Sequence, residues 1–117
     1  MLRLSRFAWR PEENPGAIWR SALTGTIAFR EPDAGILARR ETIIDELQAL
    51  LPEDALVHEA RELVPFETDA FLAYHRVPLA VCLPQTTEEV AKVLRYCHEY
   101  GIPVVPRGAG TSLAGGA

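Results

Sequence analysis

Lysine is nearly absent from this sequence, in which Lys92 is the only lysine among twelve basic side chains. The other basic residues are arginines scattered along the chain, and sixteen acidic side chains give a net charge of −4. Proteins that bind nucleic acid meet its phosphates with clustered lysines and arginines. The sequence therefore predicts no nucleic-acid partner.

Long apolar runs and cysteine motifs are absent as well. No run reaches the ~18 apolar residues that a membrane-spanning helix needs, so no membrane span is predicted. The first ten residues have neither the apolar region nor the small-residue cleavage site of a signal peptide. Only two cysteines occur, without a CxxC motif, and both lie in apolar patterns. We expect Cys82 and Cys97 to be small buried hydrophobic residues in a cytoplasmic, reducing environment.

The first 39 residues show no clear periodicity. Prolines interrupt them, and Trp9 and Trp19 follow neither helical nor strand spacing. We predict an irregular amino-terminal arm over residues 1–39 and a folded domain over residues 40–117.

An amphipathic helix is predicted to begin near Thr42 and to end before Pro52. Thr42 and Asp45 resemble a capping pair at its start. A short strand is expected near Leu56–His58. The apolar residues that repeat at helical spacing are Ile43, Ile44, Leu47, Leu50 and Leu51.

The carboxyl-terminal third predicts a strand, a helix and a second strand. Residues 79–83 are a continuous apolar run between two prolines, typical of a strand buried on both faces. Thr86 and Glu89 form a capping box, and Gly101 suits the end of the helix. A second short strand is expected at residues 102–105. The predicted fold class is therefore α+β (α/β-like) with a βαβ unit, which implies parallel strands. The apolar face of its helix is predicted to consist of Val90, Val93, Leu94 and Cys97.

A glycine-rich loop follows the second predicted strand. Four glycines occur within nine residues, beside an arginine, a threonine and a serine. Successive backbone N–H groups in such a loop can form a concavity for anions. The loop lacks the lysine of a Walker motif, and Leu113 stands at the third glycine position of the dinucleotide fingerprint. We predict a phosphate or pyrophosphate site, and the alternative is a turn without a ligand.

Residues 80–117 resemble the flavin-binding domain of the vanillyl-alcohol oxidase and p-cresol methylhydroxylase (PCMH) superfamily. The resemblance consists of a helix that opens with Thr-x-Glu-Glu-Val after a strand and of the loop pattern Arg-Gly-x-Gly-Thr-x-x-x-Gly-Gly. It extends upstream to Thr68-Asp69-Ala70 and Tyr74, and loosely to the helix near Thr42, so that it covers residues 40–117. The loop is most similar to the branch that contains the glycolate oxidase catalytic subunit and D-lactate dehydrogenase.

This resemblance implies an FAD-linked oxidoreductase that passes a hydride from a 2-hydroxy acid of the glycolate or D-lactate type to the flavin. Non-covalent FAD is expected, because residues 106–117 contain no histidine to which the flavin could be attached. No catalytic residue or metal ligand is assigned, and His58, His75 and His98 are expected to be structural or solvated. The cofactor-binding residues that the resemblance implies are Pro106, Arg107, Gly108, Ala109, Gly110, Thr111, Ser112, Leu113, Gly115 and Gly116.

The resemblance covers only the first part of a PCMH-type FAD-binding domain. We therefore expect an amino-terminal fragment, incomplete at its carboxyl end and inactive alone. The full-length protein is expected to use a small 2-hydroxy acid, and an iron–sulfur or other electron-transfer subunit is a possible partner. Two alternatives stay open: a non-catalytic phosphate- or nucleotide-binding module, and an inactive remnant that adds a strand to another subunit's sheet.

Overall fold

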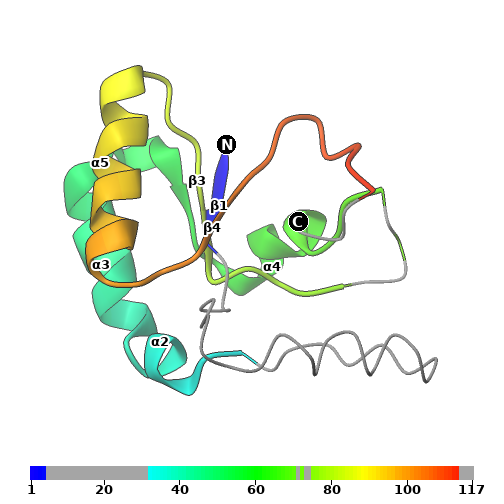
Figure 1. Ribbon diagram of the computed structural model, residues 1–117, viewed down its shortest axis with the longest axis horizontal. Coiled ribbons are helices and arrows are strands. Elements are labelled where there is room, and N and C mark those ends of the chain that lie inside the picture. Colours follow the sequence, from blue (N-terminus) through cyan, green and yellow to red (C-terminus); the bar gives the residue numbers. More distant parts are fainter. Residues whose placement is uncertain (5–31, 71, 73–74, 114–117) are drawn as a thin grey trace, which may run out of the picture.

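The extreme amino terminus lies in the middle of the sheet. The computed structural model describes residues 1–4, 32–70, 72 and 75–113. Within this part of the chain, four strands run in the order β2-β3-β1-β4, and all three pairings are antiparallel (Figure 1). The strands are β1 (Leu2–Leu4), β2 (Leu56–Val57), β3 (Ala80–Cys82) and β4 (Val104–Pro106).

Strands β3 and β4 run parallel to each other, because each is antiparallel to β1 between them. Helix α5 (Thr87–Glu99) connects these two strands along the chain. The predicted strand–helix–strand unit and the mixed α+β class are therefore confirmed. The two strands of the unit are not hydrogen-bonded neighbours, since β1 occupies the place between them.

The prediction of an irregular arm over residues 1–39 is wrong at both described ends of that segment. Leu2–Leu4 is a strand, and Ala34–Ala38 forms helix α2, whose first turn is capped by the Asp33 carboxylate. A strand of three residues is too short to show a period, and its partners lie far away in the sequence. Trp9 and Trp19 lie outside the described residues. The domain boundary at residue 40 stays a prediction.

Strand β1 places different side chains on the two faces of the sheet. Leu2 and Leu4 are buried in the cluster that α3 and α5 cover. Arg3 points to the other face because side chains alternate along a strand, and it is nevertheless only 4% exposed. Its Nη2 donates a hydrogen bond to the carbonyl oxygen of Arg76 at 2.5 Å.

Helix α3 (Arg40–Leu50) confirms the amphipathic helix but begins before the predicted start. Thr42 and Asp45 lie inside the helix, so the proposed capping pair is wrong, and Arg39 stands at the N-cap without a side-chain hydrogen bond. The short strand predicted near Leu56–His58 is confirmed as β2. The other short helices are η1 (Glu53–Ala55), α4 (Ala60–Leu63) and η2 (Val64–Phe66).

The start of α5 confirms the predicted capping box. The hydroxyl of Thr86 accepts a hydrogen bond from the Glu89 N–H at 3.2 Å. The carboxylate of Glu89 reaches back and accepts from the Gln85 N–H at 2.7 Å, one residue before the cap. Two N–H groups that the helix cannot satisfy internally are thus satisfied by side chains.

The end of α5 is a Schellman motif built on a glycine. The N–H of Ile102 donates to the Cys97 carbonyl at 2.7 Å, and that of Gly101 approaches the His98 carbonyl at 3.4 Å. Gly101 has a φ of 66°, a conformation that side chains with a Cβ rarely adopt. The predicted role of this glycine as the helix stop is therefore confirmed.

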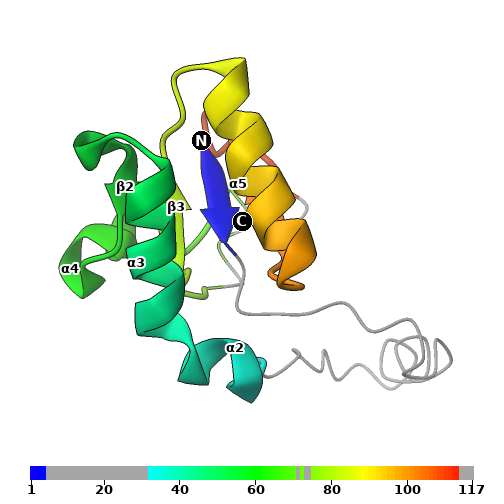
Figure 2. The same ribbon diagram turned by 90° about the vertical axis from the view of Figure 1, so that its left-hand side faces the viewer.

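The core lies between the sheet and the pair α3 and α5, which lie side by side on one face (Figures 1 and 2). All three residues of β3 are buried, as its unbroken apolar run predicted. The predicted apolar face of α5 is wrong at Leu94, which is 44% exposed, whereas Tyr96 is 9% exposed. The buried stripe is centred on Val93, Tyr96 and Cys97, because the tyrosine ring packs toward α3 and its hydroxyl finds a polar partner there.

Both cysteines are free and buried, which confirms that they act as small hydrophobic residues. Burial raises the pKa of the Cys82 and Cys97 thiols from the ordinary value of 9.0 to about 12.

We predict that a thiol reagent at pH 8 labels these two cysteines only after unfolding, because the reactive thiolate is absent from the folded state. Their neutral form favours folding fully below pH 9, and this contribution is lost as the pH rises toward 12. Labelling of the native protein as fast as in denaturant would contradict this prediction.

Candidate anion-binding site

The glycine-rich loop begins where β4 leaves the sheet. β4 pairs with β1 up to Pro106, which lies opposite Leu2. The next residue, Arg107, donates its backbone N–H to the carbonyl oxygen of Met1 at 3.0 Å. The start of the loop is therefore fixed by the first residue of the chain, and the loop extends on the side of the sheet away from α3 and α5 (Figure 1).

The side chain of Arg107 ties the loop to a second segment. Its Nη1 donates a hydrogen bond to the Thr68 carbonyl oxygen at 2.6 Å. Two residues further along that segment, the Ala70 N–H donates to the carbonyl oxygen of Ser112 at 3.0 Å. Residues 68–70 and the loop are thus joined at two points.

Gly110 adopts a backbone conformation that favours glycine and lies against the Arg107 guanidinium. Its φ is 75°, in the left-handed region. A Cβ at this position would lie 2.7 Å from Cζ of Arg107 and closer still to Nη2. At Gly108, by contrast, a Cβ would have no neighbour within 4 Å. The two glycines of the Gly-x-Gly pair therefore have different structural requirements.

The described part of the loop presents an open surface. Arg107 and Gly110 are partly buried, whereas the other described residues are exposed, and Leu113 is 74% exposed. A ligand can therefore reach this part of the loop from solvent, as an anion site requires. The exposed residues are Pro106, Gly108, Ala109, Thr111, Ser112 and Leu113.

The loop was identified from the sequence, but its three hydrogen-bonded supports, at Met1, Thr68 and Ala70, were not. The hydrogen bond to Met1 has no sequence signal at all. Thr68 was noted only as part of the family resemblance, and nothing in its pattern indicated a contact with Arg107. Gly115 and Gly116 lie outside the described residues. The assignment of the loop residues to a cofactor stays a prediction.

The histidines lie apart from the loop contacts. His98 is exposed on α5, and the His58 Nε2 lies 3.1 Å from the Gln48 side-chain nitrogen. The His75 Nε2 lies 2.7 Å from the Leu72 carbonyl oxygen. Across the described ranges of the chain, no three histidine, cysteine, aspartate or glutamate side chains gather as a metal site would need.

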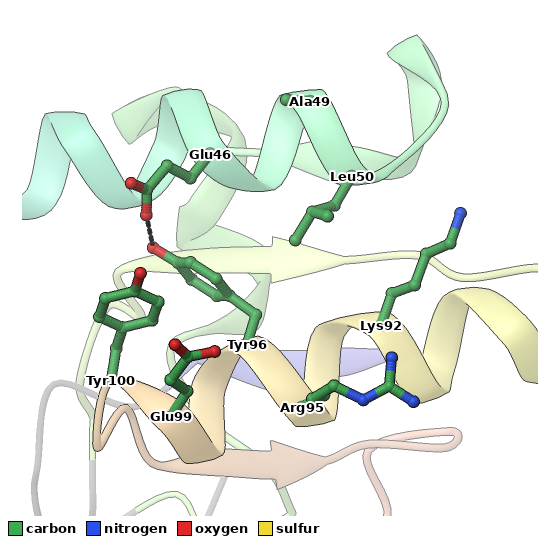
Figure 3. A pocket seen from close by; sticks show the side chains of 8 residues that line it. All are labelled: Glu46, Ala49, Leu50, Lys92, Arg95, Tyr96, Glu99 and Tyr100. Carbon is green, nitrogen blue, oxygen red and sulfur yellow. Dashed lines mark hydrogen bonds between the residues drawn. The ribbon is translucent and has the colours of Figure 1, made fainter.

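A groove of about 380 Å³ lies between α3 and α5, on the helix side of the sheet (Figure 3). The Tyr96 hydroxyl donates to Oε2 of Glu46 at 2.5 Å across this groove. Burial, followed by this hydrogen bond, raises the pKa of Tyr96 well above its ordinary value. The side chains that line the groove are Glu46, Ala49, Leu50, Lys92, Arg95, Tyr96, Glu99 and Tyr100.

Comparison with known protein families identifies the segment that carries the loop. Residues 78–117 match the family described as FAD binding domain. The match begins just before β3 and contains α5, β4 and the whole glycine-rich loop. The resemblance inferred from the sequence is thereby confirmed, and an FAD-binding domain implies FAD as the cofactor.

Three curated relatives illustrate the similarity. The glycolate oxidase subunit GlcD of Escherichia coli (strain K12) is 41% identical over 78 residues, which cover 67% of this chain and 16% of that protein. The mitochondrial D-lactate dehydrogenase [cytochrome] 1 of Saccharomyces cerevisiae is 32% identical, over 64% of this chain and 14% of that protein. The mitochondrial D-2-hydroxyglutarate dehydrogenase of Bos taurus is 35% identical, over 62% and 14% respectively.

The chain therefore spans about one sixth of the length of GlcD. No solved structure matches it significantly. In the described part of the chain, every helix is too short or too polar to cross a membrane.

Proposed function

We propose that this chain, whose residues 78–117 are part of an FAD-binding domain, provides the pyrophosphate-binding loop of an FAD-linked oxidoreductase that oxidises a 2-hydroxy acid. The relatives are named for glycolate, D-lactate and D-2-hydroxyglutarate. All three acids carry a hydroxyl on the carbon next to a carboxylate. When FAD is bound, it supplies the hydride-accepting chemistry that oxidation of such a carbon requires.

The observation that carries this proposal is the geometry of the loop after β4. Residues 108–113 are exposed apart from the partly buried Gly110, and the hydrogen bonds to Met1 and Thr68 anchor the start of the loop. Preorganised N–H groups bind an anion without losing further conformational freedom. We propose that Gly108, Ala109, Gly110 and Thr111 contact the pyrophosphate, and that Gly115 and Gly116 continue the site.

We propose that the FAD is held without a covalent bond. The natively expressed protein should then be purified with visible flavin absorbance, and denaturation followed by filtration should release all the flavin into the filtrate. The reason is that residues 106–117 offer no histidine for attachment. Flavin that remains with the denatured chain would contradict non-covalent binding, and absence of flavin from the native protein would contradict the proposal as a whole.

The reaction class is tested with the same protein under anaerobic conditions. Glycolate, D-lactate and D-2-hydroxyglutarate are each added, and bleaching of the flavin is followed. At least one of them should reduce the flavin, whereas the matching acids without the hydroxyl, acetate, propionate and glutarate, should not. A flavin that is bound but is reduced by no 2-hydroxy acid would favour a non-catalytic nucleotide-binding module.

The electron acceptor belongs to the same proposal. The relative GlcD is named as a subunit of glycolate oxidase. We propose that the full-length protein likewise passes electrons to an electron-transfer subunit, such as an iron–sulfur protein, in the cytoplasm. Co-purification of a second redox-active chain with the native protein would support this assignment.

A further inference from the structure

We propose that Arg107 is a positioning residue, whose guanidinium shapes the glycine-rich loop from within rather than pairing with a bound phosphate. This inference rests on the proposed FAD function and adds to it the residue whose contacts set the loop conformation. An arginine beside a phosphate-binding loop is ordinarily expected to supply positive charge to the ligand. Here its Nη1 already donates to a protein carbonyl oxygen, that of Thr68, at 2.6 Å.

The backbone of Arg107 is engaged as well. Its N–H donates to the Met1 carbonyl oxygen at 3.0 Å, so this amide is already used within the protein. Arg107 therefore connects three segments that are distant in the sequence: the first residue, the segment at Thr68 and the loop itself. The side chain is partly buried, in contrast to its exposed neighbours Pro106 and Gly108.

The guanidinium also lies directly against residue 110, whose positive φ already favours glycine. It occupies the space into which a Cβ at this position would project, with Cζ 2.7 Å from that point. A Cβ at residue 110 would therefore force the guanidinium to shift, and the φ of 75° at this residue adds backbone strain to any such substitution. Arg107 and Gly110 are thus packed against each other, and the guanidinium keeps its present position, with its hydrogen bond to Thr68, only while residue 110 has no Cβ.

A second hydrogen bond closes the far end of the loop. The Ala70 N–H donates to the Ser112 carbonyl oxygen at 3.0 Å, two residues along from the Thr68 contact. The loop is thereby anchored to residues 68–70 on both sides of its Gly-x-Gly pair. Loss of either anchor should leave the loop attached to β4 but free to sample conformations that bind an anion poorly.

A lysine could not replace this arginine. Lysine preserves the charge, but its ammonium is a compact, rotatable point donor, whereas guanidinium is a flat group with several donors in fixed directions. A residue that only attracted phosphate would tolerate the exchange. A residue that fills the space under Gly110 while it bonds to Thr68 would not.

The test is a double-mutant cycle for FAD affinity in the natively expressed protein. Variants Arg107→Ala, Arg107→Lys, Gly110→Ala and Arg107→Ala/Gly110→Ala are stripped of flavin and titrated with FAD by fluorescence. Each single substitution should weaken FAD binding by about tenfold or more, an effect typical of lost preorganisation. The double variant should lose less affinity than the product of the two single effects, because the overlap with the guanidinium exists only when Arg107 is present, whereas the backbone strain at residue 110 remains.

Matched controls separate loop geometry from charge and from folding. Arg95→Ala removes an exposed arginine from α5 and should leave FAD affinity unchanged. Gly108→Ala adds a Cβ where no atom lies within 4 Å and should be milder than Gly110→Ala. Thermal midpoints of the flavin-free variants should fall by less than about 4 °C, which excludes global unfolding as the cause.

Two outcomes would overturn the inference while leaving the FAD function intact. One is normal FAD affinity in Arg107→Lys, which would mean that a positive charge is sufficient. The other is a double variant in which the two single effects multiply, which would mean that Arg107 and Gly110 act independently. If instead the unsubstituted protein binds no FAD, the proposed function itself fails, so the two failures are distinguishable.

Discussion

Gly110→Asp should abolish FAD retention in the natively expressed protein. The substitution adds a Cβ that overlaps the Arg107 guanidinium, at a φ of 75° that residues other than glycine seldom adopt. It also introduces a carboxylate beside the place proposed for a doubly negative pyrophosphate. Steric and electrostatic effects act in the same direction, so we expect affinity to fall by about a hundredfold or more, equivalent to at least ~3 kcal/mol. The measurement is the flavin-to-protein ratio after purification, followed by FAD titration.

Gly101→Asp is the matched control for this prediction. Gly101 has a similar φ of 66°, but a Cβ there would meet no atom within 4 Å, and the residue ends α5 instead of lining the loop. The same charge and nearly the same backbone strain are thereby introduced elsewhere. Gly101→Asp should cost about 1 kcal/mol of stability and leave FAD bound. Normal flavin absorbance in Gly110→Asp would refute the assignment of the loop, and loss of flavin from both variants would indicate a general folding defect.

Local interactions made α5 and its neighbours predictable from the sequence. The Thr86–Glu89 box and the Gly101 stop act over three or four residues, so the sequence contains all the information that sets the helix ends. The buried strand β3 was equally predictable from the sequence, because a strand covered on both faces is apolar at every position. The exposure of Leu94 was not predicted, because the helical period locates the centre of the buried stripe only to within one residue.

Long-range pairing accounts for what the sequence did not reveal. Leu2-Arg3-Leu4 carries too few residues for a period, and its place between β3 and β4 depends on partners about 80 to 100 positions away. The candidate site divides in the same way. Its glycine-rich sequence predicts a loop that can bind an anion. The contact of Arg107 with Thr68 could not be predicted, because it joins two segments that are distant in the sequence. Composition thus located the loop, and only tertiary structure identified its supports.

Leu4→Ala should destabilise the protein by about 2–5 kcal/mol, the usual cost of truncating a fully buried leucine. Leu4 is 0% exposed, in the central strand, opposite Ala80 on one side and Val104 on the other. A loss of this size is a large part of the ~5–15 kcal/mol that ordinarily separates folded from unfolded domains. The midpoint of urea unfolding measures it, with Leu94→Ala as the control, because Leu94 is 44% exposed and should cost less than about 1 kcal/mol. Equal effects of the two substitutions would show that the amino terminus is not part of the core. A loss confined to Leu4→Ala would establish that β1, which directly follows the residue that anchors Arg107, also holds the sheet together.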